Sequence, residues 1–312
     1  MSMSTPFTTT KSFRVDNRVG RQEVAKHTLG VLKYCEYLLG DKRIPVDVKG
    51  ACESTILYTP ESKLNFPLSS SPSSISTPTP TSTTRISVVQ ESTLEAIRRL
   101  LTTQTETKAQ LHPKPKLRSV CALNFASARS PGGGFLNGAT AQEESLARSS
   151  ALYACLTLDR VQQFYKANEA PSGGFYTDHI IYSGHVPVFR KDDGSLLAEP
   201  HSVAMLTVPA VNAGLVYDRS ERQGRSARDV QPEIDRRMQY RIERLLGVAA
   251  EHKHDTLVLG AFGAGVFRHS ADRVAKYFAE ALAGPFRSVF AEVVFAIYDK
   301  GPNLYAFQKR FG

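Results

Sequence analysis

Apolar residues in the first part of the chain recur at helical spacing. Within residues 20–40 the side chains of Val24, Leu29, Leu32 and Leu38 fall near one helical face, so the pattern predicts an amphipathic helix there. A second helical stretch is predicted over residues 46–57, and the proline at position 60 would stop it. These segments precede the main body of the chain and are expected to pack onto it.

After residue 84 the pattern changes regularly between short apolar runs and helical spacing. Strands are predicted at 85–90, 119–125, 179–189, 203–209, 256–261 and 289–298. Helices are predicted at 91–102, 142–158, 231–251 and 270–283. The strand at 289–298 is expected to close the sheet. Strands that alternate with helices indicate an α/β sandwich with a largely parallel or mixed sheet, in which ligands bind beyond the carboxyl ends of the strands.

A low-complexity segment interrupts this pattern at residues 67–84. Its sequence is PLSSSPSSISTPTPTSTT, in which only Leu68 and Ile75 are not Ser, Thr or Pro. Such a composition cannot bury enough apolar surface to form a core. The 60 or so residues before it would make a marginal domain alone, so the segment is interpreted as an insert and not as a domain boundary.

Charge composition favours a partner that carries phosphate. The formal net charge is +9, and this balance suits a nucleotide, a nucleic acid or another polyanion. The densest basic cluster, residues 219–244, alternates with acids in the manner of a solvated helix face. Because no nucleic-acid motif with interleaved aromatic residues accompanies it, direct nucleic-acid binding is not expected.

The cellular location of the protein is indicated by the lack of a membrane-spanning segment and of a signal peptide in the sequence. No run of 18 apolar residues occurs, and the amino terminus has no apolar stretch of the kind a signal peptide needs. The four cysteines are widely spaced, without a CxxC pair, as expected for reduced thiols. We therefore expect an intracellular protein, cytoplasmic or nuclear, with no membrane partner.

Two glycine-rich loops each follow a predicted strand and precede a predicted helix. The first lies within residues 124–144 and contains Gly132, Gly133 and Gly134; the second is GAFGAGVF at 260–267. Glycines let a ligand approach the main chain, and free amides near a helix start hold phosphate oxygens. Neither loop is a Walker A or GxGxxG motif, which disfavours an ATPase or a dinucleotide-binding fold.

The segment QEES opens the helix after the first loop and carries Glu143 and Glu144. Ordinary acids at a helix start would give the same pattern. Adjacent helical side chains diverge by about 100 degrees, so the two carboxylates cannot flank one bond and must have different roles. A glycosidase that uses one carboxylate first as acid and then as base needs only one of them at the leaving oxygen.

Together these segments resemble the bacterial-type (microbial) poly(ADP-ribose) glycohydrolases, a macrodomain-like family. The resemblance rests on PGGGFLNGATAQEES, on VAKHTLGVLK, on ESTLEAIRRL and on GAFGAGVF, and it covers most of residues 20–311. It implies an α/β fold: a three-layer α/β/α macrodomain with a mixed central sheet and added N-terminal helices. We then expect residues 1–19 to be disordered and 20–312 to form a single catalytic domain that contains the 67–84 insert.

The resemblance also implies roles for site residues. Glu144 would be the general acid and later the base, Glu143 would hydrogen-bond the ribose on the leaving side, and Gln142 would be a positioning residue. Many macrodomains have a second Asn shortly before the glycines, where this chain has Ser127. The substrate-binding positions that the resemblance implies are Asn124, Gly132, Gly133, Gly134, Gln142, Gly263, Ala264, Gly265, Val266 and Phe267.

The activity that the resemblance implies is hydrolysis of ribose–ribose O-glycosidic bonds from chain ends. Poly(ADP-ribose) or an ADP-ribosylated protein would be the substrate and ADP-ribose the product. No cofactor is expected, and no metal, because His252 and His254 form an isolated HxH without further ligands at zinc spacing. The alternatives are a mono-ADP-ribosyl hydrolase and a non-catalytic ADP-ribose-binding macrodomain; the intact Gln142–Glu144 segment argues against the second.

Overall fold

The structure, a computed structural model, describes residues 15–64, 83–110, 119–170 and 172–312. The strands are β1 (Glu36–Leu39), β2 (Lys42–Pro45), β3 (Thr55–Tyr58), β4 (Arg85–Val89), β5 (Val120–Phe125), β6 (Ile180–Arg190), β7 (Leu196–Val208), β8 (Thr256–Leu259) and β9 (Glu292–Ala296). Seven of them form one sheet in the order β3-β6-β7-β5-β8-β9-β4, and β1 and β2 form a separate hairpin. In the sheet β4, β9, β8, β5 and β7 run parallel, whereas β6 is antiparallel to both its neighbours. The predicted mixed sheet is confirmed.

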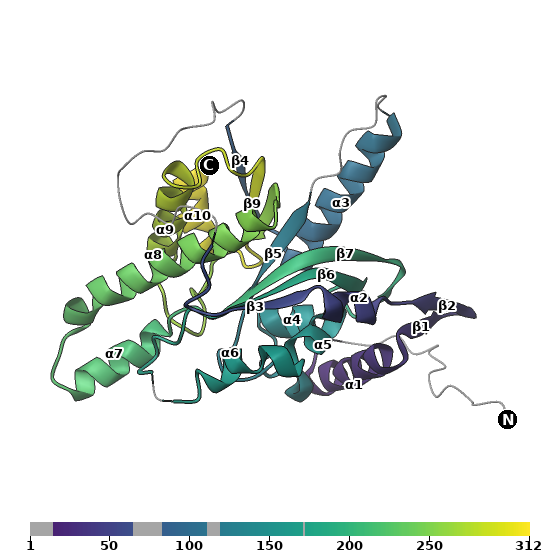
Figure 1. Cartoon of the computed structure of the whole chain (residues 1–312), viewed down its shortest axis with the longest axis horizontal. Helices are drawn as coiled ribbons and strands as arrows, with labels where there is room; N and C mark the ends of the chain where they lie inside the picture. The colour runs from purple at the N-terminus through teal and green to yellow at the C-terminus, as the bar shows by residue number, and fades with distance from the viewer. Residues whose placement is uncertain (1–14, 65–82, 111–118, 171) are drawn as a thin grey trace.

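Helices cover both faces of this sheet (Figure 1). They are α1 (Arg18–Tyr34), α2 (Val48–Glu53), α3 (Thr93–Gln110), α4 (Gln142–Ser149), α5 (Leu152–Leu156), α6 (Gln163–Lys166), α7 (Ala213–Arg222), α8 (Ala227–Glu251), α9 (Ala271–Ala283) and α10 (Pro302–Phe311), with short 3₁₀ turns η1 (Phe135–Asn137) and η2 (Asp159–Val161). Helices α8, α9 and α10 pack against one face, and α3, α4 and α5 pack against the other. The predicted three-layer α/β/α fold is confirmed.

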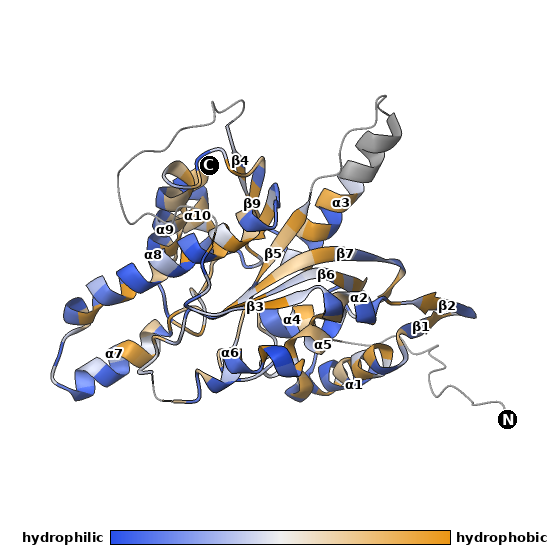
Figure 2. Ribbon diagram, in the orientation of Figure 1, coloured by the Kyte–Doolittle hydropathy of each residue, from blue (hydrophilic) through white to orange (hydrophobic). Residues whose placement is uncertain are grey.

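Burial on both faces of the sheet explains the apolar sequence of the central strand β5. Cys121 and Leu123 belong to the core under α8 and α9, whereas Val120 and Ala122 belong to the core under α3 and α4. A strand with both faces covered by helices is apolar at every position. The central strands accordingly stand out as hydrophobic in Figure 2.

Two N-terminal predictions need correction. The helix predicted over 46–57 is only α2, because the segment after Ser54 becomes the edge strand β3, which pairs antiparallel with β6. The helix predicted within 20–40 ends at Tyr34, where Cys35 takes a left-handed conformation with φ of 56° and starts the β1–β2 hairpin. In the first place a long-range pairing with β6, and in the second a local hairpin, overrides the helical pattern.

Two later predictions are also wrong in detail. The helix predicted at 142–158 is interrupted, since Ser150 is extended and bridges to Val188 of β6; α4 and α5 lie on either side. The strand predicted to close the sheet, β9, instead lies between β8 and β4, so β4 is the edge. Helices α7 and α10 were not predicted.

The N-terminal helix fastens to the first glycine loop. Arg18 and Arg21 donate hydrogen bonds from Nε to the carbonyl oxygens of Asn137 and Gly138, at 2.9 and 2.7 Å. Helix α1 starts at Arg18, so the end of the segment expected to be disordered is helical, and residues 1–14 lie outside the described residues. The insert at 67–84 also lies outside them, except for its last two residues. Within the described ranges, no helix is both long enough and apolar enough to cross a membrane.

Candidate active site

A cleft of about 310 Å3 lies beyond the carboxyl ends of β5 and β8. Parallel strands of an open α/β sheet place their ligand sites at this edge. The two glycine loops predicted to hold a ligand both contribute to it, from opposite sides. Its lining residues are Phe125, Ala126, Ser127, Arg129, Ala141, Gln142, Glu143, Glu144, Tyr176, Ala210, Ala261, Phe262, Gly263, Gly265, Val266 and Phe267.

Gln142 ties the start of α4 to the end of β5. Its Oε1 accepts a hydrogen bond from the Phe125 backbone N at 2.8 Å, and its Nε2 donates to the Leu123 carbonyl at 2.7 Å. The same Nε2 donates to Thr93 Oγ1 at 3.1 Å. Because both ends of the amide are engaged with the protein, Gln142 fixes the helix that carries the two glutamates and does not offer its amide to a ligand.

Glu143 is buried beneath the cleft, with 2% of its surface exposed. Its Oε2 accepts from the Ser127 backbone N at 2.7 Å, and its Oε1 accepts from Asn124 Nδ2 at 3.4 Å. Burial raises the pKa of Glu143 to about 8; these hydrogen bonds oppose the shift, and the nearby Glu144 charge adds to it.

Glu144 differs from Glu143 in how its oxygens are bonded. Its Oε1 accepts from the Gly134 backbone N at 2.9 Å. Its Oε2 is buried and has no hydrogen-bond partner among the described residues, although the side chain lines the cleft. A buried polar atom without a partner is costly in a folded protein, and such atoms occur where a ligand supplies the missing bond.

The three glycines of the first loop lie behind the glutamates instead of lining the cleft. Gly133 has φ of +58°, and a Cβ there would lie 2.3 Å from Glu144 Oε1 and 3.0 Å from Glu143 Oε2. Gly132 has φ of +67°, and its Cβ would press on Phe135 and Tyr153. Gly133 therefore makes room for the two carboxylates and Gly132 for two aromatic rings, while the ligand contact expected of these glycines stays a prediction.

Asn124 faces inward, whereas Ser127 lines the cleft. Asn124 is fully buried and donates from Nδ2 to Thr207 Oγ1 at 3.2 Å as well as to Glu143. It lies behind Glu143 and does not line the cleft. Ser127 Oγ accepts from the backbone N of Arg129 and Ser130, at 3.3 and 3.2 Å, and so shapes the loop. In this structure Asn124 Nδ2 holds Glu143, while Asn124 Oδ1 is buried without a hydrogen-bond partner among the described residues, and its contact with a ribose stays a prediction.

In the second loop the backbone itself faces the cleft. Gly263, Gly265, Val266 and Phe267 line it, whereas Ala264 packs against the core. Gly263 has φ of +78°, and a Cβ there would lie 2.8 Å from Ala210 Cβ. Val266 is 84% exposed. A loop of small residues with its backbone exposed can hold diphosphate oxygens through main-chain amides.

Tyr176 also lines the cleft and could not be predicted from the sequence. Its ring centroid lies 6.0 Å from that of Phe267, and its backbone is left-handed with φ of 54°. The fully buried Arg241 supports this turn: it donates to the Tyr176 carbonyl at 3.3 Å and pairs with Asp178 at 2.7 Å. These groups are far apart along the chain, so only the fold brings them together.

His252 and His254 lie at the opposite edge of the sheet, before β8. His252 Nε2 is 2.8 Å from the Tyr58 hydroxyl, and its ring stacks on Tyr182 at 3.5 Å. His254 Nε2 is 2.9 Å from the Tyr182 hydroxyl, and its Nδ1 is 2.7 Å from Ser119 Oγ. Within the described residues, no group of three His, Cys, Asp or Glu side chains could hold a metal ion.

Comparison with known proteins gives one consistent family. The family model of the microbial-type PARG (poly(ADP-ribose) glycohydrolase) catalytic domain matches residues 25–191, which include the first glycine loop and both glutamates. A crystal structure of poly(ADP-ribose) glycohydrolase from Thermomonospora curvata is 39% identical, with a TM-score of 0.79 over 94% of this chain and 100% of that one. Its complex with the inhibitor ADP-HPD is 38% identical, with a TM-score of 0.76 and the same coverage. The enzyme from Deinococcus radiodurans in complex with ADP-ribose is 36% identical, with a TM-score of 0.68 over 85% and 96% of the two chains. A search of curated proteins found no match.

Proposed function

The chain belongs to the microbial-type poly(ADP-ribose) glycohydrolases and is a glycosidase that hydrolyses poly(ADP-ribose), and on that premise we propose that Glu144 is its general acid and base. We propose further that it cuts ribose–ribose bonds from chain ends and releases ADP-ribose. The observation that carries the assignment is the difference between the two glutamates. Glu144 lines the cleft, and its Oε2 is buried without a partner among the described residues, whereas both oxygens of Glu143 accept N–H bonds.

This difference supports separate roles for the two carboxyls. Both oxygens of Glu143 are held by N–H groups, so Glu143 is fixed in place. Glu144 keeps one oxygen without a partner among the described residues, from which a proton can be passed to a ligand. Glu143 remains an acceptor that can hydrogen-bond a hydroxyl of the leaving ribose, while Gln142 and Asn124 keep the pair in place.

The reaction follows from that arrangement. Glu144 protonates the departing ribose oxygen, the glycosidic C–O bond breaks, and positive charge develops on the distal ribose. The substrate's own diphosphate, held on the amides of Gly263, Gly265, Val266 and Phe267, stabilises this charge. A water molecule then attacks the anomeric carbon and loses a proton to the Glu144 carboxylate, which restores the acid. Phe267 and Tyr176 are proposed to shield the ribose from bulk water.

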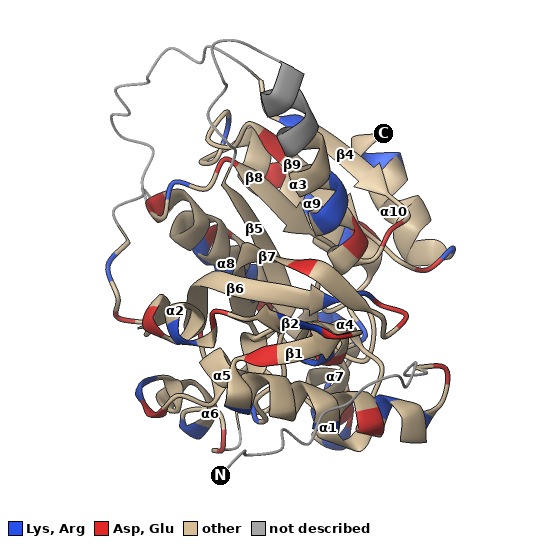
Figure 3. Cartoon of the chain, turned by 90° about the vertical axis from the view of Figure 1, so that its right-hand side faces the viewer, with Lys and Arg blue, Asp and Glu red and all other residues tan. Residues whose placement is uncertain are grey.

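The cleft also supports the proposed ligands. The Deinococcus radiodurans relative was solved with ADP-ribose and the Thermomonospora curvata relative with the inhibitor ADP-HPD, and we propose that ADP-ribose is the product bound here. Poly(ADP-ribose) or an ADP-ribosylated protein would be the substrate, without cofactor or metal, in the cytoplasm or the nucleus. Lys and Arg are interspersed with Asp and Glu over the side of the chain in Figure 3, in agreement with a site-specific ligand and not a nucleic-acid face.

The test is release of ADP-ribose from poly(ADP-ribose), followed by chromatography. The intact protein should release it without added metal, and Glu144→Gln should lose about 100- to 10,000-fold in rate, the usual effect of removing a positioned acid. Glu233→Gln, an exposed acid on α8, is the matched control and should retain full activity. A Glu144→Gln variant with normal activity would remove Glu144 from the mechanism.

The product profile tests where the enzyme cuts. Cleavage from chain ends should give monomeric ADP-ribose from the first time points, with the remaining polymer shortening gradually. Early fragments of intermediate length would contradict chain-end action. Release from a singly ADP-ribosylated protein, with no release from polymer, would favour the mono-ADP-ribosyl hydrolase.

We also propose that residues 20–312 act as one catalytic domain, with 67–84 as a tolerated insert. The insert joins β3 and β4, which lie at opposite edges of the sheet. Replacing it with a Gly/Ser linker of the same length should leave kcat and the unfolding midpoint unchanged. A large loss of either would give the insert a functional or structural role.

A further inference from the structure

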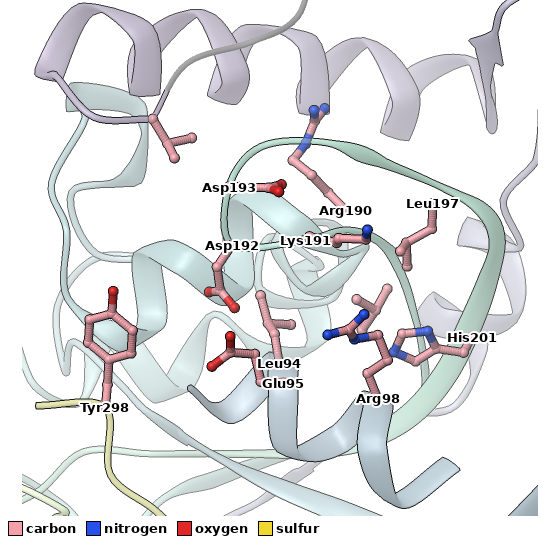
Figure 4. Close-up of a pocket in the computed structure, with 12 residues that line it drawn as sticks. Leu94, Glu95, Arg98, Arg190, Lys191, Asp192, Asp193, Leu197, His201 and Tyr298 are labelled. Atoms are coloured by element: carbon pink, nitrogen blue, oxygen red, sulfur yellow. The ribbon is translucent and has the colours of Figure 1, made fainter. Parts of the chain in front are cut away.

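A second cavity, of about 510 Å3, lies between the start of α3 and the β6–β7 hairpin (Figure 4). It is open to solvent and large enough for a ligand of nucleotide size. Three elements distant in sequence supply its polar residues. These are Glu95 and Arg98 on α3, Lys191, Asp192, Asp193 and His201 on the hairpin, and Tyr298 after β9.

Basic and acidic groups in this cavity differ in how they are engaged. Asp192 accepts from Ser92 Oγ at 2.6 Å and from Ser145 Oγ at 3.0 Å, so both of its oxygens are used. Asp193 accepts from the Ser195 backbone N at 2.8 Å. In contrast, neither Arg98 nor Lys191 has a side-chain hydrogen bond or ion pair with another described residue, although their charges contribute to lowering the pKa of Asp193. Cations that face a cavity with their hydrogen-bond donors free favour an anionic ligand.

His201 and Tyr298 complete the cavity at its two ends. His201 lies beside Arg98 (Figure 4), and its Nε2 is buried without a hydrogen-bond partner among the described residues. Burial, and then the Arg98 charge, lowers the pKa of His201, so the ring is neutral at pH 7. Tyr298 is 74% exposed, and its ring is available for stacking on a base. Cations at one end and an aromatic ring at the other suit a nucleoside with a phosphate group.

The second cavity adjoins the catalytic helix. Ser145, whose hydroxyl binds Asp192, directly follows Glu144 in sequence. Gln142 Nε2 binds Thr93, which directly precedes the cavity residue Leu94. The two sites are therefore separated by the first turns of α4 and α3.

We propose that this cavity binds the ADP-ribose unit on the leaving side of the scissile bond, with its diphosphate on Arg98 and Lys191 and its adenine on Tyr298. The inference rests on the proposed function, since it requires a polymer in the cleft. The leaving unit is joined through its adenosine ribose, so its base would lie nearer to Glu144 and its diphosphate farther away. Tyr298 follows β9 at the edge of the sheet where the cleft lies, which suits contact with the base. Arg98 on α3 and Lys191 on the hairpin are then placed to contact the diphosphate.

The experiment compares two substrates: poly(ADP-ribose), and an ADP-ribose glycoside whose leaving group is a p-nitrophenyl ring without phosphate. In the Arg98→Gln/Lys191→Gln double variant the KM for polymer should rise about tenfold with kcat little changed. This is the expected result when the lost charged contact is equally strong in the enzyme–substrate complex and in the transition state. The slope of log KM against log salt should fall by about 1 to 2. Tyr298→Ala should raise the KM for polymer about fivefold. The glycoside should be cleaved as by the unsubstituted protein in all variants.

Matched controls separate the cavity from general surface charge. Arg236→Gln/Lys276→Gln removes two cations from exposed positions on α8 and α9, and Tyr305→Ala removes a tyrosine that is 68% exposed on α10. Both should leave the KM for polymer unchanged. Circular dichroism and the unfolding midpoint confirm that each variant is folded.

The remaining outcomes each overturn the inference in a recognisable way. If the unsubstituted protein hydrolyses polymer and the cavity variants match their controls, the leaving-side site is wrong while the proposed function stands. Equal losses on polymer and glycoside would show that the cavity only supports α4. If the unsubstituted protein cleaves the glycoside but not the polymer, the proposed polymer activity itself fails, and the leaving-side site fails with it.

Discussion

The two glycine loops of this protein have similar sequences and different uses. In the first, the glycines lie behind the glutamates, where Gly133 leaves the space that Glu144 Oε1 occupies. In the second, Gly263 and Gly265 line the cleft, and a Cβ at Gly265 would meet nothing within 4 Å. A glycine-rich loop beside a ligand site can therefore serve the catalytic side chains or the ligand. Only the structure distinguishes the two.

Gly133→Ala is the substitution that should affect the first loop most. Its Cβ would overlap Glu144 Oε1, and the positive φ adds strain, so the carboxylate must move from its position at the cleft. A displaced general acid loses most of its effect, and kcat should fall about 100-fold or more. Steady-state kinetics on polymer measure this. An active Gly133→Ala enzyme would show that the loop does not position the acid.

Glu143→Gln should show how much the ionised, buried Glu143 carboxyl lowers the free energy of unfolding. Because burial raises the pKa of Glu143 to about 8, its contribution to stability is fully present below about pH 4.5 and is lost as pH rises towards 8. A glutamine removes the charge and keeps one acceptor oxygen, but its NH2 then faces an N–H donor, which lowers stability equally at every pH. The difference in the free energy of unfolding between the variant and the unsubstituted protein should therefore shift by about 2 to 4 kcal/mol in favour of the variant between pH 4 and pH 7.

Denaturant unfolding across this pH range checks the prediction. Glu251→Gln, at an acid outside the cleft, is the control and should not reproduce the pH-dependent gain. The informative quantity is the difference in the free energy of unfolding between Glu143→Gln and the unsubstituted protein. If this difference is no larger at pH 8 than at pH 4, burial of Glu143 is not the cause of a pH-dependent stability.

Phe267→Ala tests the second loop through its side chain. Phe267 lines the cleft beside Tyr176, and removing the ring should weaken the contact with the ribose. We expect the Kd for ADP-ribose to rise about tenfold, the effect of a lost aromatic contact, as measured by calorimetry. Phe311→Ala on α10, away from the cleft, should leave the Kd unchanged; an unchanged Kd in Phe267→Ala would exclude this contact.

Gly265→Ala should have the smallest effect and so sharpens the contrast with Gly133→Ala. The position has open space around it and no positive φ in the structure. We expect kcat/KM to change by less than about threefold, because an added methyl group leaves the amides free to bind diphosphate. A loss as large as that in Gly133→Ala would show that the two loops are equivalent after all.

Much of the fold could be predicted from the chain because its signals are local. The apolar run of β5 and the helical spacing of α8 and α9 each report a burial pattern that the surrounding layers enforce. Ser150 could not be read in this way. It breaks the predicted helix because it pairs with Val188 on a strand 38 residues later, and single-sequence periodicity does not report such pairing.

The same limit applies to the site. The two loops and the glutamates were predicted because their motif is contiguous. That Asn124 lies behind Glu143, that Gln142 uses both ends of its amide, and that Arg241 supports Tyr176 all depend on contacts between distant elements. Arg98 and Lys191 in the second cavity are separated by nearly a hundred residues and likewise carry no common sequence signal.

The role of Glu144 as the acid is tested most directly by the leaving group. Rates of the unsubstituted protein and of Glu144→Gln would be compared on poly(ADP-ribose), whose leaving hydroxyl requires a proton, and on the p-nitrophenyl glycoside, whose leaving group does not. We expect a loss of about 1,000-fold on polymer and a loss at least tenfold smaller on the glycoside, where only the later base step is slowed. Equal losses on both substrates would contradict general-acid catalysis by Glu144.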